Sequence, residues 1–294
     1  MTGPTGVGKS SLAVALAERL DGEILGADAF QIYAGLPVLT AQPTPEQLAA
    51  VPHHLFGFLD LRENFNAARF VQVAREQMAE IVSRGKLPIL VGGTGLYLKA
   101  LTHGLAEMPP VDPTQRERIS SLTLEAATEE LAKADPEALK QIDLKNPVRI
   151  RRALEIVLQT QRPLAESRGA WSRESSEFRG LVLTREREDL RARIEANVTQ
   201  MLAGGAIEEV RSAARAGEGA RRAIGFREIE KFLAGKTSLD ACREAIATAT
   251  KRYAKRQLTW CRTQFSFPSL DLTALPQPES ALPRALEILA TQAP

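Results

Sequence analysis

The sequence predicts a mixed α/β fold in which helices flank a parallel β-sheet and an α-helical domain is inserted. Short apolar runs that end in glycine or an acidic residue alternate with helix-period segments, a pattern typical of parallel sheets. From about residue 110 the strand pattern stops, and polar helical segments continue to about residue 168. We therefore expect a doubly wound sheet from residues 1–109 and 178–294, and a helical insertion domain from residues 110–177.

The composition is that of an ordinary globular protein. Hydrophobic residues make up 44% of the 294 residues and charged residues 25%, which excludes disordered, collagen-like and coiled-coil chains. With 38 Lys and Arg against 36 Asp and Glu, the charge balance neither requires nor excludes a nucleic-acid partner. Two cysteines form no disulfide framework, and no apolar run reaches the roughly 18 residues of a membrane span. We expect a cytoplasmic protein with no membrane partner, and a monomer by default.

The first element is a phosphate-binding motif. Residues 3–10 read Gly-Pro-Thr-Gly-Val-Gly-Lys-Ser and match G-x-x-x-x-G-K-[ST]. Glycines let backbone N–H groups turn toward phosphate oxygens, Lys9 adds positive charge and Ser10 can bind Mg²⁺. The helical segment 11–20 presents its positive N-terminal end to the same anion. The motif predicts a P-loop NTPase-like core that binds a di- or triphosphate, such as that of ATP, with Mg²⁺.

A strand normally precedes such a loop, yet only Met1 and Thr2 stand before Gly3. We expect the gene to start upstream. Without the strand, the sheet would lose a central member and the loop would lose its anchor.

The next apolar segment, residues 23–27, is expected to be a strand, and Asp28 follows it. Ligands of doubly wound sheets bind beyond the carboxyl ends of the strands, so Asp28 is aimed at the phosphate site. A general base, a Mg²⁺ ligand and a helix N-cap are the roles that remain open for it. Residues 34–66 carry several prolines and are expected to be loop, with His53 and His54 in structural roles.

A second glycine-rich turn follows another strand. Helix spacing predicts a helix over residues 67–83, and the apolar run 87–91 predicts a buried strand. The turn Gly92-Gly93-Thr94-Gly95 then lies at the carboxyl edge of the sheet. Thr94 is expected either to bond a phosphate or nucleotide or to cap the helix 96–101.

Basic residues gather in the second half of the chain. Three arginines between residues 149 and 152 open a helix over 150–159, and basic residues recur at 221–227 and between 251 and 262. Clustered positive charge favours contact with RNA phosphates, the alternative being an ordinary solvated surface. A strand over 180–183 and helices over 187–203 and 283–290 complete the predicted core. Tyr253 and Trp260 are expected to pack in it, the alternative being that they stack on a base.

Several motifs in one order resemble the tRNA dimethylallyltransferase (tRNA isopentenyltransferase) family. The resemblance runs from Gly3 to about Arg262. It rests on the P-loop and on residues 27–33, 40–43, 51–55, 91–97, 146–152, 223–227 and 254–260.

The resemblance implies a reaction. The dimethylallyl group of dimethylallyl diphosphate passes to the exocyclic amine of the adenosine 3′ to the tRNA anticodon, and diphosphate leaves, with Mg²⁺ as cofactor. Asp28 is then the base, and Lys9 and Thr5 complete the catalytic set. The diphosphate is held by Gly3, Pro4, Thr5, Gly6, Val7, Gly8, Lys9 and Ser10, the last as the metal ligand.

The resemblance also implies contacts with the anticodon stem-loop. They fall on Asp28, Ala29, Phe30, Gln31, Thr94, Arg116, Val148, Arg149, Ile150, Arg151, Arg152, Arg222, Ala223, Ile224, Gly225, Phe226 and Arg227.

Four residues depart from the family pattern. Ala29 stands where serine is usual, Gln42 where lysine is usual and Val148 where glutamine is usual. Asn197 stands where we expect an arginine that contacts the diphosphate, and Arg193, one turn earlier, is expected to supply that contact. The residues alone leave two alternatives: a P-loop kinase acting on a small molecule, and a non-catalytic RNA- or nucleotide-binding protein.

Overall fold

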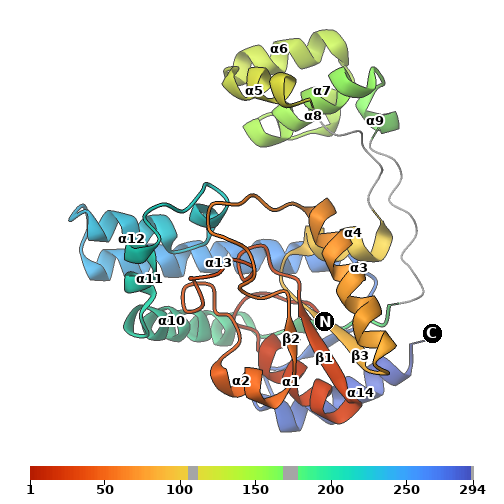
Figure 1. The fold of residues 1–294 in the computed structure, drawn as a ribbon, viewed down its shortest axis with the longest axis vertical. Coiled ribbons are helices and arrows are strands. Elements are labelled where there is room, and N and C mark those ends of the chain that lie inside the picture. Colours follow the sequence, from red (N-terminus) through yellow and green to blue (C-terminus); the bar gives the residue numbers. More distant parts are fainter. Residues whose placement is uncertain (105–111, 168–177, 293–294) are drawn as a thin grey trace. The chain divides into compact units, whose positions relative to one another are not determined.

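The computed structural model describes residues 1–104, 112–167 and 178–292, which form two compact units (Figure 1). Unit 1 contains the described residues of Met1–His103 and Glu174–Pro294, and unit 2 those of Gly104–Arg173. Unit 1 has helices around parallel strands, and the described elements of unit 2 are all helices. The predicted α/β fold class is confirmed.

All strand pairs among the described residues of unit 1 are parallel. Strand β1 (Gly22–Gly26) lies between β2 (His53–His54) and β3 (Leu87–Val91). Strands β4 (Val182–Thr184) and β5 (Ser269–Asp271) form a second parallel pair. The carboxyl ends of β1 and β3 therefore meet at one edge, as the sequence predicts for the segments that carry Asp28 and the second glycine-rich turn.

The first two residues join the two sets of strands. Thr2 forms parallel bridges with Gly92, just after β3, and with Val182 of β4. Its backbone N–H donates to the Leu181 carbonyl at 2.9 Å, and its carbonyl accepts from the Leu183 N–H at 2.8 Å. These bonds anchor the P-loop, because the segment before it is held between residues of two remote parts of the chain.

Helices cover both faces of the sheet. Side chains alternate along a strand, so neighbouring residues of β3 face opposite ways. Val91 packs in a cluster with α1 (Lys9–Leu20), whereas Leu90 packs in a cluster with α3 (Ala67–Ser83) and α4 (Gly95–His103). This layering places the start of α1 and the start of α4 beside the same edge of the sheet.

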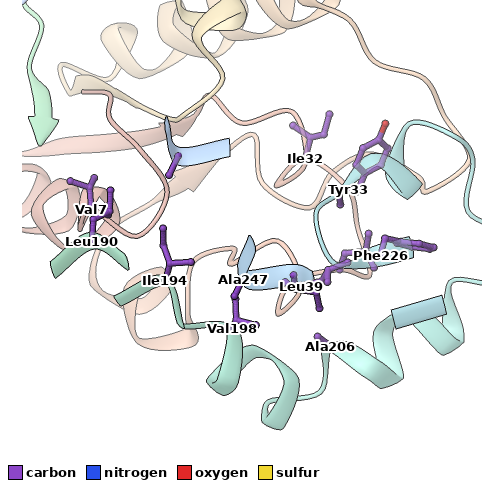
Figure 2. Close-up of a cluster of buried hydrophobic side chains, with 14 of the residues drawn as sticks. Val7, Ile32, Tyr33, Leu39, Leu190, Ile194, Val198, Ala206, Phe226 and Ala247 are labelled. Carbon is purple, nitrogen blue, oxygen red and sulfur yellow. The ribbon is translucent and has the colours of Figure 1, made fainter. Parts of the chain in front are cut away.

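The largest core cluster lies mostly in the C-terminal part of unit 1 and includes Leu190, Ile194 and Val198 of one helix together with the P-loop residue Val7 (Figure 2). The helices of this part are α10 (Arg187–Ala203), α11 (Ala206–Ser212), the 3₁₀ turn η1 (Ala220–Arg222), α12 (Phe226–Leu233), α13 (Leu239–Gln264) and α14 (Pro278–Ala290). The predicted bounds of the helix over 187–203 are confirmed, whereas the last helix begins five residues before the predicted start at 283.

The segment 34–66 is not loop throughout. Helix α2 (Pro45–Ala50) begins there, because the Thr44 side chain accepts a hydrogen bond from the Gln47 N–H while the Gln47 side chain bonds back to Thr44. Pro45 occupies the first helical turn, where its missing N–H costs nothing. Prolines were therefore a sign of a helix start as well as of loop.

Unit 2 has its own apolar core, which includes the fully buried side chains of Ile119, Leu131 and Leu154. Its described helices are α5 (Pro113–Ser121), α6 (Leu124–Ala134), α7 (Ala138–Gln141), α8 (Pro147–Thr160) and α9 (Leu164–Ser167). Asn146 caps α8 by accepting hydrogen bonds from the N–H groups of Val148 and Arg149. None of the helices in the described parts of the chain is long and apolar enough to cross a membrane.

A buried carboxylate joins three helices of unit 2. Asp135 is only 6% exposed. One of its oxygens accepts from the Ala138 N–H at 3.2 Å, and the other accepts from the Leu164 N–H at 2.7 Å. The carboxylate therefore bonds the chain where α7 and α9 begin, directly after the end of α6.

We predict that Asp135→Ala lowers the free energy of unfolding of unit 2 by about 2 kcal/mol or more, because two buried N–H groups lose their acceptors. Asp143→Ala is the matched control, since Asp143 is exposed and bonds only a local N–H, that of Lys145 at 3.0 Å. Urea unfolding followed by circular dichroism measures both variants. Equal losses would show that the Asp135 bonds do not hold the unit together.

Candidate active site

A cavity of about 320 Å³ lies in unit 1 at the carboxyl edge of β1 and β3. Its lining includes the P-loop and the start of α1, the turn after β1, the loop around residue 40, the segments 53–56, 91–93 and 223–224, and helices α10 and α13. Residues from these segments include Thr5, Lys9, Ser10, Asp28, Phe30, Gln31, Thr40, Arg193, Asn197, Ile224, Tyr253 and Gln257. The structure thus brings together the phosphate loop and the carboxylate that the sequence singled out.

Two arginines hold carbonyl groups of the P-loop. The Arg193 Nε donates to the Gly6 carbonyl, and the Arg185 Nε donates to the Val7 carbonyl, both at 3.0 Å. Arg185 is buried and also bonds Asp189 at 2.6 Å, which fixes its guanidinium. The two guanidinium groups thus occupy these carbonyl oxygens. Because Arg193 lies in α10 and Arg185 lies just before it, this part of the chain holds the loop conformation.

The loop needs glycine at two of its turns. Gly6 and Gly8 have φ angles of 79° and 110°, in a region that is strained for residues with a side chain. Gly8 also stands immediately before α1, so the N-terminal end of this helix faces the loop. The loop backbone therefore takes a conformation that residues with a side chain would strain, directly before the N-terminal end of a helix.

Lys9 lies inside the loop. Its Nζ donates to the Gly3 carbonyl at 3.0 Å and to the Pro4 carbonyl at 2.8 Å. Burial lowers the pKa of Lys9 to about 8, and the nearby Asp28 carboxylate acts in the opposite direction. An arriving diphosphate would offer this ammonium a stronger partner than two neutral carbonyls.

Asp28 follows β1 and faces the same cavity. Its Oδ1 accepts from the Phe30 N–H at 2.9 Å. Burial raises the pKa of Asp28, while the Phe30 N–H and the Lys9 charge lower it in part. Within the described stretch 27–44 no helix begins, so the N-cap role that we left open for this carboxylate does not apply.

The second glycine-rich turn is bonded to the Asp28 turn. The Thr94 Oγ1 accepts from the Ala29 N–H at 2.9 Å, and the Thr94 N–H donates to the Ala27 carbonyl at 3.2 Å. The hydroxyl that we expected to contact a phosphate or to cap a helix therefore joins two loops in this structure. His53 and His54 serve structural contacts, His54 through a 2.6 Å bond to Glu23.

The remaining predicted contacts in unit 1 differ in exposure. Arg222 and Arg227 are exposed, and Arg227 pairs with Glu218 at 2.8 Å. The side chains of Ala223 and Phe226 are buried in the core, and Ala223 and Ile224 also line the cavity.

The predicted contacts in unit 2 lie at the start of α8 and on α5. Val148, Arg149 and Arg152 are exposed, whereas Ile150 is fully buried. Arg152 and Arg116 both pair with the Glu155 carboxylate, at 2.8 and 3.5 Å. The Arg151 Nη2 donates to the Leu122 carbonyl at 2.7 Å, so this side chain packs against its own unit.

Sequence reasoning missed Arg185 and Gln257. Gln257 lies within the motif 254–260, but the pattern of that motif drew attention to its basic and aromatic residues. Arg185 has no motif around it, and only its contact with the P-loop in three dimensions shows its use. An arginine just after a predicted core strand could have indicated this contact from the sequence.

Comparison with known proteins agrees with these features. Residues 31–264 match the family model described as IPP transferase. A tRNA dimethylallyltransferase of Caulobacter sp. (strain K31) is 42% identical over 279 residues, covering 90% of this chain and 89% of that protein.

Two solved structures are similar over nearly the whole chain. A tRNA isopentenylpyrophosphate transferase of Bacillus halodurans is 33% identical with a TM-score of 0.71, covering 99% of this chain and 96% of that one. A eukaryotic dimethylallyltransferase acting on tRNA is 28% identical with a TM-score of 0.83, covering 97% and 76%. The chain belongs to the IPP transferase family.

Proposed function

We propose that this protein transfers the dimethylallyl group of dimethylallyl diphosphate to the exocyclic amine of the adenosine 3′ to a tRNA anticodon, releasing diphosphate. One observation carries the proposal: a P-loop and a partly buried carboxylate line the same cavity in a member of this family. The named relatives act on tRNA or carry tRNA in their names, which supports the acceptor.

The P-loop would hold the diphosphate. Its N–H groups and the Lys9 ammonium offer hydrogen bonds and charge to phosphate oxygens, and Arg193 stands at the rim beside Gly6. Negative charge grows on the diphosphate as its bond to the allyl carbon breaks. Donors fixed in place before the reaction stabilise that charge most effectively.

Asp28 would receive the proton. The exocyclic amine of adenine is a weak nucleophile because its lone pair is delocalised into the ring, so it needs both an electron-poor allyl carbon and a base. Burial raises the pKa of Asp28, which makes the carboxylate a better proton acceptor near neutral pH. Lys9 stabilises its ionised form, so the base remains available.

Ser10 would hold Mg²⁺. The side chain is exposed in the first turn of α1 and lines the cavity, which fits a metal that usually binds one or two protein oxygens together with phosphate oxygens and water. Within the parts of the chain that the structure describes, no group of three or more His, Cys, Asp and Glu residues could form a protein-only site. When bound, Mg²⁺ supplies positive charge to the leaving diphosphate.

The acceptor adenosine must leave its stack to reach Asp28, which costs about a few kcal/mol. We propose that exposed arginines compensate for part of this cost by binding the anticodon arm. In unit 2 these are Arg149 and Arg152, and in unit 1 Arg222 and Arg227. The basic residues of α13 are further candidates for backbone contacts.

We predict that Asp28→Asn lowers the transfer rate by about 10²- to 10⁴-fold, because the amide cannot accept the proton. Diphosphate binding should stay near that of the unchanged protein, since the P-loop is intact. The assay incubates the protein with labelled dimethylallyl diphosphate, or with labelled ATP, and unmodified tRNA. Label in tRNA from the allyl donor supports the proposal, phosphate transfer from ATP supports a kinase, and binding without turnover supports a non-catalytic role.

The pH dependence of kcat/KM should reflect the ionisation of both Asp28 and Lys9. We expect kcat/KM for the donor to fall as pH drops through the raised pKa of Asp28, because protonation removes the base. It should also fall as pH rises through about 8, where Lys9 in the free protein loses its charge. Initial rates over a pH series measure both limbs. An acid limb that persists unchanged in Asp28→Asn would exclude Asp28 as its source.

We predict that Asn197→Arg strengthens donor binding by about 10- to 100-fold, since a charge-assisted hydrogen bond contributes about 1.5–3 kcal/mol. Asn197 is exposed and lines the cavity near Gly6. Asn197→Lys tests whether charge alone suffices. Calorimetric titration with inorganic diphosphate gives the affinity directly, and unchanged or weaker binding in both variants would show that this position does not face the diphosphate.

A further inference from the structure

One side chain of α13 bonds two of the loops that line the cavity. Gln257 is 5% exposed. Its Oε1 accepts from the Thr5 backbone N–H at 2.8 Å, and its Nε2 donates to the Gly93 carbonyl at 2.9 Å. The partners fix the orientation of the amide, because a flipped side chain would place a donor against the N–H and an acceptor against the carbonyl.

The second glycine-rich turn is shaped to admit this helix. A Cβ atom on Gly93 would lie 2.2 Å from the Gln257 Nε2, and one on Gly95 would lie 2.0 Å from the Trp260 Cδ1. Either side chain would push α13 away from the turn. The glycines of this turn therefore allow the close approach of Gln257 and Trp260.

The bonds continue from Gly93 to Asp28. Thr94 follows Gly93, and its hydroxyl accepts from the N–H of Ala29, the residue next to Asp28. Two side chains, those of Gln257 and Thr94, thus connect Thr5 in the P-loop to the turn that carries the Asp28 carboxylate. All of these residues belong to unit 1.

We propose that Gln257 is a positioning residue that sets the separation between the P-loop, where the donor binds, and Asp28. The inference rests on the proposed function. Gln257 acts through Thr5 and Gly93, and its two bonds hold backbone groups whose displacement moves the allyl carbon relative to the acceptor amine. A misplacement of about 1 Å between reacting groups can lower a rate about 10²-fold.

Two substitutions separate positioning from simple packing. Gln257→Met keeps the length of the side chain but makes neither bond, so kcat should fall about 10- to 100-fold while KM for donor and tRNA changes by less than about threefold. Gln264→Met is the matched control, because it makes the same chemical change near the end of the same helix and removes a side-chain bond to Lys99, a residue outside the cavity lining. It should leave kcat unchanged.

Gln257→Glu allows a measurement, the pH dependence of kcat, that would show no change if Gln257 only packed against its neighbours. A protonated carboxyl can accept from the Thr5 N–H and donate to the Gly93 carbonyl, whereas the ionised form can only accept. The ratio of its kcat to that of the unchanged protein should therefore rise as pH falls. The corresponding ratio for Gln257→Met should stay flat across the same pH series.

The outcomes distinguish this inference from the proposed function. If the unchanged protein and Gln264→Met transfer no label to tRNA, the proposed function fails. If both transfer label and Gln257→Met has kcat within about twofold of theirs, or if only KM changes, the positioning role is wrong. A flat ratio for Gln257→Glu also overturns it, and this pH series decides alone if Gln257→Met does not fold.

Discussion

The separation between the P-loop and the Asp28 carboxylate is the constraint on which the proposed active site depends. Each loop at the edge of the sheet is attached to a different strand. The loops could therefore move relative to one another unless contacts between them fixed their positions. Here hydrogen bonds do so: Thr2 bonds to residues of a neighbouring strand, two arginines hold the P-loop carbonyls, and Thr94 holds the turn after β1. Each bond contributes modestly to stability, yet together they fix the geometry that chemistry requires.

Charge in the cavity is balanced in a way that suits a substrate with two phosphates. Burial lowers the pKa of Lys9 and raises the pKa of Asp28, so each group is moved toward its neutral form, and each counteracts the shift of the other. Ionisable groups that share a cavity and have shifted pKa values are common in sites of acid–base chemistry. A bound diphosphate would stabilise the charged form of Lys9. The cavity would therefore bind an anion without holding a permanently exposed positive charge.

Much of the fold could be predicted from the sequence, because its signals are local. The apolar run 87–91, the helix periods of 67–83 and 187–203 and the glycines of the P-loop each determine structure through neighbouring residues. Contacts between distant residues could not be predicted that way. Gln257 reaches Thr5 across 252 positions of the chain, and Arg185 reaches Val7 across 178, so no spacing pattern reveals either. The role of Thr2 was missed for the same reason, since its partners lie in two remote segments.

A structure of the protein with an unreactive analogue of dimethylallyl diphosphate and an anticodon stem-loop tests the central claim most directly. It should show the analogue's phosphates within the glycine turns of the P-loop and the extruded adenine amine within hydrogen-bond distance of the Asp28 carboxylate. An Asp28 side chain turned away from the purine, or phosphates bound outside the P-loop, would contradict the account.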